Sequence, residues 1–327
     1  MSTDTHPGPS GGTGADPVSA GVIHDIGYRA YDGPRVGRGR IAAALCWQSL
    51  RAAFGLGRGA KAKIVPVITF VIMCTPAVVN AVAIALSRSH DRVFDYDTYT
   101  NNLRVLVTML FIAVQAPELV ARDLRSRVLP LYFARPIRRR DYPAAKYAAF
   151  VLACLALIDI PVLLLYIGTI MQVHSGSQVW AQTRALVPGL LVGLMWSVLL
   201  AAIGLALASV SGRRAFSVGS VVIFLFLTWT LANVLTKIVE APVRPGPVPA
   251  GPGAAVSTAA VPASAHLFGL ISPYTVLDGV RQWLGGTDPG IVARPGGYGI
   301  AYGVMLLVFL GVSLAALFAR YTSVSVA

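Results

Sequence analysis

The sequence has little charge for its length. Charged residues make up 13% of its 327 residues, whereas soluble domains are about a quarter charged. Hydrophobic residues reach 55%, so a soluble domain of this size would have too little polar surface to remain in solution. The shortage of charge therefore excludes an ordinary soluble domain and indicates a membrane protein.

Short motifs of nucleotide and metal sites are also missing. No Gly-Lys pair occurs, so the phosphate-binding loop GxxxxGK[ST] is absent. The five histidines are scattered, which excludes a local zinc pair of the HExxH type, and the three cysteines lack metal-ligand spacing. We therefore expect no enzyme activity, cofactor or metal site in this chain, and free thiols at Cys46, Cys74 and Cys154.

Acidic residues are scarce relative to basic ones. The chain has 27 Lys and Arg against 14 Asp and Glu, for a net charge of +13. The cations cluster beside apolar runs and no recognisable nucleic-acid-binding module occurs, so we predict no nucleic-acid partner. Lys and Arg in short loops keep those loops in the cytosol. The excess is thus expected to set topology and to contact anionic lipids of the bilayer.

What the sequence does contain is a series of six apolar runs, each long enough to cross a hydrocarbon core of about 30 Å. We predict an all-α membrane protein with transmembrane helices over residues 64–86, 102–119, 148–171, 185–210, 216–239 and 298–318 of a six-span domain, 64–319. The second is the least regular, because Arg104 and Glu118 lie near its ends. Both side chains are expected to snorkel towards the membrane interface.

The distribution of cations predicts the orientation of these spans. Fifteen Lys or Arg lie near the spans on the side that holds residues 121–146, whereas the short loops of the other side hold three, Arg88, Arg92 and Arg184. This bias places both termini in the cytosol. Because the composition is rich in Ala, Gly, Pro and Arg, we expect a bacterial plasma membrane.

The N-terminal part precedes the first span. Residues 1–22 are rich in Gly, Pro, Ser and Thr and lack the apolar core of a signal peptide, so we expect a disordered cytoplasmic tail. Residues 23–63 comprise a lead-in and a predicted amphipathic helix, 41–56. Its apolar face holds Trp47, Leu50, Ala53 and Phe54. Such a helix either lies in the membrane interface or packs as an ordinary cytoplasmic helix.

The segment 121–146, ARDLRSRVLPLYFARPIRRRDYPAAK, carries eight Lys or Arg and lies between the second and third spans. Leu, Tyr, Phe and Pro are interspersed among its charges, which a simple tether does not need. The segment is either a solvated basic loop that orients the flanking spans, or a cytoplasmic docking surface as well. In the second case we expect residues 123–146 to form one short rigid helix.

One acidic residue, Asp159, lies well inside a predicted span, two residues before Pro161. A charged side chain at the bilayer centre costs roughly 2.5 to 3.5 kcal/mol, so Asp159 should face the bundle, a polar cavity or a partner subunit. Two interpretations remain open: it fixes helix packing through a hydrogen bond, or it lines a substrate path.

The predicted external loop, 240–297, contains a short structured element after a Pro- and Ala-rich stretch. In SPYTVLDGVRQWLGG, Ser272 can cap a helix that starts at Pro273, and Gly285 can close it. Apolar residues recur at helical spacing, namely Val276, Leu277, Val280, Trp283 and Leu284. The run is too short to span, so it is a re-entrant or interfacial helix, preceded by residues 266–271, or a helix packed on the loop.

Together these features resemble a known family. The pattern "LYxxRP…Y…K" is met by Leu131, Tyr132, Arg135, Pro136, Tyr142 and Lys146. With six spans, an amphipathic helix before the first and short helices between the fifth and sixth, the chain is similar to permease subunits of ATP-binding-cassette (ABC) transporters of the type 2 exporter class, over roughly residues 21–318. The lead-in IHDIGYRAYDGPRVGRGR resembles actinobacterial members. The Pro- and Ala-rich external stretch is longer than in many relatives.

The resemblance implies a function and partners. The chain would be the permease of an ATP-driven exporter of an amphiphilic drug, lipid, glycan or peptide, dimerising with a second copy or a sibling. ATP and Mg would bind a separate ABC ATP-binding subunit, which the cytoplasmic coupling segment would contact. The polar contacts expected there are Asp123, Arg125, Arg138, Asp141 and Arg135, and the apolar ones Leu131, Tyr132 and Phe133. Asp159 would be the candidate for the translocation path.

Two other classes of function fit the composition. A secondary transporter usually places several ionisable residues or broken helices in matched halves of the membrane domain, and here Asp159 stands almost alone. A non-transporting membrane assembly factor would need neither. A neighbouring reading frame with a GxxxxGK[ST] loop would favour the ATPase-coupled class.

Overall fold

The computed structural model describes residues 33, 36–87, 95–96, 99, 101–126, 132, 137–173, 175–210, 213–240, 263–285 and 295–322. The chain divides into a unit of Met1–Val36 and a unit of Gly37–Ala327. The tail predicted at residues 1–22 and most of the lead-in lie outside the described residues. Every described helix belongs to the second unit.

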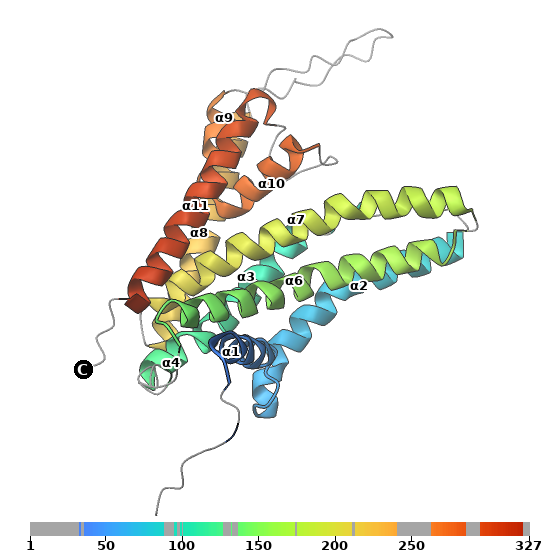
Figure 1. The fold of residues 1–327 in the computed structure, drawn as a ribbon. Helices are drawn as coiled ribbons and strands as arrows, with labels where there is room; N and C mark the ends of the chain where they lie inside the picture. The colour runs from blue at the N-terminus through green and yellow to red at the C-terminus, as the bar shows by residue number, and fades with distance from the viewer. Residues whose placement is uncertain are drawn as a thin grey trace, which may run out of the picture. The chain divides into compact units, whose positions relative to one another are not determined.

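Six helices of the described part are long and apolar enough to cross a membrane, as predicted. They are α2 (Ile64–Ser87), α3 (Asn101–Leu119), α6 (Asp141–Ile170), α7 (Gly176–Ser209), α8 (Arg214–Glu240) and α11 (Gly299–Thr322). The described residues contain no strand, so the all-α class is confirmed for them. Figure 1 shows α2, α6 and α7 side by side, and α11 packs against α7.

Two of these helices start earlier than their apolar runs. The apolar runs begin at residues 148 and 185, whereas α6 begins at Asp141 and α7 at Gly176. Hydropathy marks the part of a helix that suits the bilayer, but backbone hydrogen bonding continues into polar turns. Asp141 lies in the first turn of α6, where a carboxylate interacts favourably with the positive end of the helix dipole. The added turns of α6 carry Tyr142 and Lys146, and both side chains contact Asp123.

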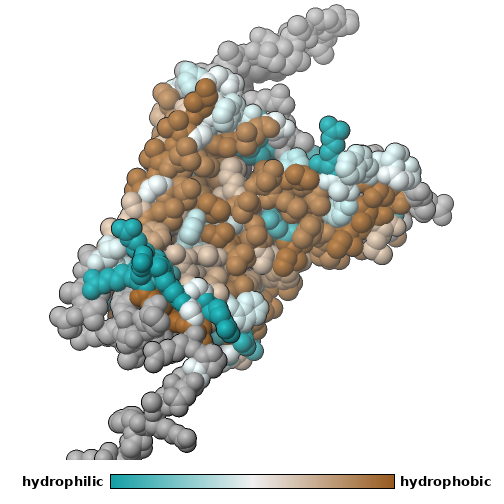
Figure 2. All heavy atoms as spheres, in the orientation of Figure 1, coloured by the Kyte–Doolittle hydropathy of each residue, from teal (hydrophilic) through white to brown (hydrophobic). Residues whose placement is uncertain are grey.

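The bundle is organised around α3 and α7. In each, 67% of the most apolar stretch is buried, against 28% in α2, 17% in α8 and 11% in α11. The helices α2, α8 and α11 therefore turn apolar side chains outward, among them Val67, Ile223 and Leu307, each more than half exposed. Figure 2 shows apolar residues over most of the visible face, with strongly hydrophilic residues gathered beside α1 and α4. This is the distribution expected of a chain surrounded by lipid.

Glycines allow α7 to approach its neighbours closely. A Cβ at Gly204 would overlap the Ile112 side chain of α3, and one at Gly193 would overlap the Asp159 carboxylate of α6. Between transmembrane helices there is little hydrophobic driving force, so small residues that permit backbone contact favour association. Gly193 and Gly204 therefore set how closely α7 packs on α6 and α3 in the core of the bundle.

The first helix, α1 (Arg38–Ala53), begins three residues before the predicted one. Its buried residues are Leu45, Ser49 and Ala53, and it packs mainly on α6. Trp47 is 62% exposed, so it does not share the buried face, although sequence periodicity groups it with Ala53. The side chain of Trp47 points away from the core, because the face of α1 that packs on α6 is the one that carries Leu45, Ser49 and Ala53.

Between α8 and α11 lie α9 (Ala263–Phe268) and α10 (Pro273–Trp283). The predicted start of α10 is confirmed: the Ser272 side chain accepts a hydrogen bond from the Tyr274 amide, and Pro273 is the first residue. Gly285, at φ 93°, follows the helix end. The predicted apolar stripe is buried at Val276, Leu277 and Val280, but Trp283 and Leu284 are 47% and 73% exposed.

The close approach of α7 and α3 gives a first prediction. Gly204→Ala should lower the free energy of unfolding by about 1 to 3 kcal/mol, because its new methyl group overpacks against Ile112. The matched control is Gly219→Ala in α8, where a Cβ meets nothing within 4 Å. Unfolding of the purified protein in mixed detergent micelles measures both. Equal stability of the two variants would contradict the close packing of Gly204.

Candidate functional site

The segment between α3 and α6 is not one helix. Helix α4 (Ala121–Arg125) is only five residues long, and the described residues Ile137–Arg140 precede α6 without being helical. The expectation of a single rigid helix over residues 123–146 is therefore wrong. Three successive cations at residues 138–140 repel one another, and the segment's prolines disfavour a helix interior.

Asp123 nevertheless connects the two helices that flank this segment. Its Oδ2 accepts a hydrogen bond from the Tyr142 hydroxyl at 2.6 Å and lies 2.9 Å from Lys146 Nζ. The Asp123 and Lys146 side chains are 16% and 9% exposed, and the ammonium group also lies 5.5 Å from the centre of the Tyr142 ring. A partly buried charge pair with the Tyr142 hydroxyl as a second donor holds α4 against the first two turns of α6.

Aromatic rings extend this contact to the last helix. The Tyr142 ring lies 5.4 Å from the Tyr132 ring and 5.1 Å from the Tyr321 ring of α11. Arg139 donates a hydrogen bond to the Thr322 carbonyl at 3.4 Å. Since Tyr142 and Tyr321 are fully buried, the end of α11 packs firmly beside the start of α6.

A second carboxylate, Asp141, connects α6 to α1. Two guanidinium nitrogens of Arg38 each lie 2.5 Å from an oxygen of Asp141, and the Arg138 amide donates to Asp141 at 2.9 Å. The hydrogen bond from Arg38 to Asp141 raises the pKa of that guanidinium. Because the Arg38 side chain is 44% exposed, this pair orients α1 and adds only modestly to stability.

A third carboxylate, Glu118, connects α3 to two other elements. It lies 2.5 Å from Arg58, in the turn after α1, and 2.9 Å from Arg214, the first residue of α8. Its side chain is 9% exposed. Snorkelling of Glu118 into solvent, as expected from its place near the end of α3, is thus replaced by two ion pairs.

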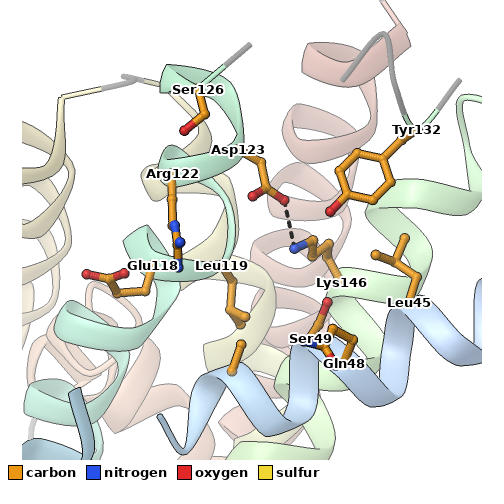
Figure 3. A pocket seen from close by; sticks show the side chains of 11 residues that line it. Leu45, Gln48, Ser49, Glu118, Leu119, Arg122, Asp123, Ser126, Tyr132 and Lys146 are labelled. Atoms are coloured by element: carbon orange, nitrogen blue, oxygen red, sulfur yellow. Dashed lines mark ion pairs between the residues drawn. The ribbon is translucent and has the colours of Figure 1, made fainter. Parts of the chain in front are cut away.

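A cavity of about 470 Å³ lies among these groups. Figure 3 shows side chains of α1, α3, α4 and α6 around it, with the Asp123–Lys146 ion pair on one side. The lining residues are Leu45, Gln48, Ser49, Ala52, Glu118, Leu119, Arg122, Asp123, Ser126, Tyr132 and Lys146. We refer to this region, with Tyr142, Asp141 and Arg38, as the basic-end site. It is built from parts of four helices.

The structure sorts the predicted contact residues into two groups. Asp123 and Asp141 are bonded within the chain, and Tyr132 is half-buried against Tyr142. Arg125 and Arg138 are exposed. The remaining members of the predicted set, Leu131, Phe133 and Arg135, lie outside the described residues.

Asp159 of α6 lies inside the bundle, 9% exposed, with its carboxylate against Gly193 of α7. Its Oδ1 has no hydrogen-bond partner among the described residues, while Arg104 interacts with it electrostatically. Arg104 is itself 1% exposed, donates to the Tyr99 carbonyl at 2.7 Å and lies 5.3 Å from the Trp196 ring centre. The expected snorkelling of Arg104 is therefore wrong: its charge turns inward, towards Asp159 and an aromatic face.

Sequence reasoning missed the partners of the three carboxylates. Arg38, Arg58 and Arg214 are each distant in sequence from the acid that they contact, and basic residues are too frequent for spacing to pair them. Lys146 and Tyr142 belonged to the recognised pattern, but the pattern gave no indication that they bind Asp123.

Comparisons with known proteins identify no family for this chain. No protein-family model matches the chain, and no curated protein matches it significantly. The described residues contain no cluster of His, Cys, Asp and Glu that could hold a metal ion.

The Asp123 contact can be tested by a double-mutant cycle. Lys146→Gln should lower the free energy of unfolding by about 1 to 3 kcal/mol, because it leaves a partly buried carboxylate short of its counter-charge. Adding Asp123→Asn should recover part of this loss. Arg140→Gln, an exposed cation just before α6, is the control and should change little. Strictly additive effects of Lys146→Gln and Asp123→Asn would show that the pair is not coupled.

Proposed function

We propose that the chain is the membrane-spanning permease subunit of an ABC transporter of the type 2 exporter class. Six membrane-capable helices support this proposal, as does the resemblance carried by residues 131–146. Transport of an amphiphilic drug, lipid, glycan or peptide would be powered by ATP hydrolysis on a separate subunit. The chain would lie in a bacterial plasma membrane with both termini in the cytosol and would pair with a second permease.

The observation that carries the proposal is the direct connection of α4 to α6 through Asp123, Lys146 and Tyr142. A partner that pushes on α4 also moves α3, since α4 follows α3 after one residue, and it moves α6 through the ion pair. Such bonding makes the segment a mechanical link even though it is not one helix. A simple solvated loop would not need a partly buried charge pair that joins its two ends.

This geometry assigns different roles to the predicted residues. The exposed Arg125 and Arg138 would contact the ATPase, with Leu131, Phe133 and Arg135 of the same segment. Asp123 and Asp141 would hold the segment on α6 and α1. Nucleotide-driven closure of the ATPase dimer would then rotate α3 and α6 together and open the permease outward.

The coupling role predicts the effect of reversing exposed charges. In proteoliposomes with the ATPase encoded by a neighbouring reading frame, Arg125→Glu with Arg138→Glu should lower permease-stimulated ATP hydrolysis about tenfold, because like charges at an interface cost several kcal/mol. The matched control is Arg40→Glu with Arg51→Glu, which reverses two exposed cations of α1. The control should retain both membrane insertion and stimulation.

Three results would contradict the proposal. Undiminished stimulation by the Arg125/Arg138 variant would exclude this surface as the coupling contact. Copurification without any nucleotide-hydrolysing chain, or transport by the purified chain alone, would favour a secondary transporter.

Asp159 is proposed to contribute to the translocation path, because its Oδ1 has no hydrogen-bond partner among the described residues and such an atom is costly to bury. Asp159→Asn should preserve thermal stability, because the cost of burying the carboxylate and its interaction with Arg104 are lost together, while transport falls at an unchanged protein level. Trp196→Phe, which alters the neighbouring aromatic face, is the comparison variant. Lower stability with unchanged transport would instead assign Asp159 to helix packing.

A further inference from the structure

A second cavity, of about 610 Å³, lies on the other side of Glu118. It is bounded by η1 (Ala60–Lys63) and the start of α2, by the last turns of α3, and by the start of α8. The lining residues are Arg58, Gly59, Ala60, Lys61, Ala62, Val65, Val114, Gln115, Glu118 and Arg214. Since α3 packs on both α2 and α8, the cavity is a groove with α3 as its floor.

The charge of this groove is strongly unbalanced. Three cations, Arg58, Lys61 and Arg214, face the single carboxylate of Glu118, so two positive charges are in excess. Glu118 is shared between Arg58 and Arg214, and Lys61 makes no ion pair with a described residue. The Arg214 side chain is 56% exposed. The groove therefore presents donors that an anion can reach.

Apolar side chains lead away from these cations along the same helices. On α3, Val114, Leu110 and Leu106 follow Glu118 at intervals of four residues, and Leu110 and Leu106 are 48% and 46% exposed. From Glu118 to Leu106 this face of α3 extends for about 18 Å. Beside the cations, Val65 of α2 and Val114 of α3 line the cavity itself. The groove thus changes from cationic to apolar along its length.

The turn after α1 is built to place Arg58 here. Gly55 and Gly57 have positive φ values of 69° and 81°, a region that favours glycine. A Cβ at Gly55 would lie 2.6 Å from the Ala62 carbonyl oxygen. The turn therefore folds back onto η1 and holds Arg58 and Lys61 at one end of the groove.

We propose that this groove binds an anionic phospholipid, with the phosphate at Arg58, Lys61 and Arg214 and an acyl chain along Leu106, Leu110 and Val114. Basic pockets between transmembrane helices suit anionic headgroups, and each cation near such a lipid contributes about 1 kcal/mol. The apolar stripe distinguishes a lipid from a soluble phosphate compound. The site does not depend on the proposed transport function.

The experiment uses the full-length protein as it purifies, with any subunit that accompanies it. The protein is equilibrated with equal amounts of dioleoylphosphatidylglycerol and dioleoylphosphatidylcholine, and retained lipids are counted by native mass spectrometry. Wild type should retain phosphatidylglycerol preferentially. Lys61→Gln should lower that preference about fivefold, and Glu118→Gln should raise it about fivefold, because one removes a cation and the other removes the competing carboxylate.

A matched control separates the groove from general surface charge. Arg51→Gln removes an exposed cation of α1 that does not line the groove, and its preference should equal that of wild type. An equal loss in Lys61→Gln and Arg51→Gln would overturn the site. The opposite signs expected for Lys61→Gln and Glu118→Gln cannot arise from a general loss of folding.

A second arm identifies the source of the phosphate. Addition of sn-glycerol 3-phosphate should leave the retained phosphatidylglycerol in place, because it lacks the acyl chain that contacts α3. Displacement at equal concentration would overturn the lipid assignment in favour of a soluble phosphate ligand. Absence of retained lipid in wild type, with α2 and α8 of two copies cross-linking across the groove, would overturn it in favour of a second copy.

Discussion

Three carboxylates hold together the end of the bundle at which α1 and α4 lie. Glu118 joins the turn after α1 and the start of α8 to α3, Asp123 joins α4 to α6, and Asp141 joins α6 to α1. Each acid contacts a cation that is distant in sequence. In a chain with 27 Lys and Arg and only 14 Asp and Glu, few acids are present, and these three are used to fix the relative positions of five helices.

Such polar contacts carry more of the specificity here than in a soluble protein. Outward side chains of α2, α8 and α11 are apolar, and lipid solvates them as well as a protein core does, so burial alone does not select one helix arrangement. Selection comes from close contacts at Gly193 and Gly204 and from charge pairs at the helix ends. Close packing at these glycines contributes inside the bundle, and ion pairs contribute where α1 and α4 lie.

The sequence predicted the elements better than their contacts. Apolar length predicted the six spans, and Ser272 with Pro273 predicted the start of α10, because both signals are local. Ion-pair partners such as Arg214 and Glu118 are far apart in the sequence. Because the chain has many cations for each acid, sequence spacing does not predict which cation an acid contacts. Arg104 was misjudged for a similar reason: its place near a helix end suggested snorkelling, but an aromatic face at Trp196 and the nearby Asp159 offered it an inward alternative.

Glu118 also connects the two cavities, since it lines both of them. On one side the cavity reaches Asp123 and Lys146, where movement of α4 would be passed to α6. On the other, Arg58 and Arg214 divide their charge between Glu118 and any anion in the groove. An anion that draws these two cations away weakens their hold on Glu118, and α3 is the helix that carries it. Because a coupling free energy between two binding sites is reciprocal, a partner on the α4 side whose affinity depends on an anion in the groove would change the anion affinity of the groove by the same factor.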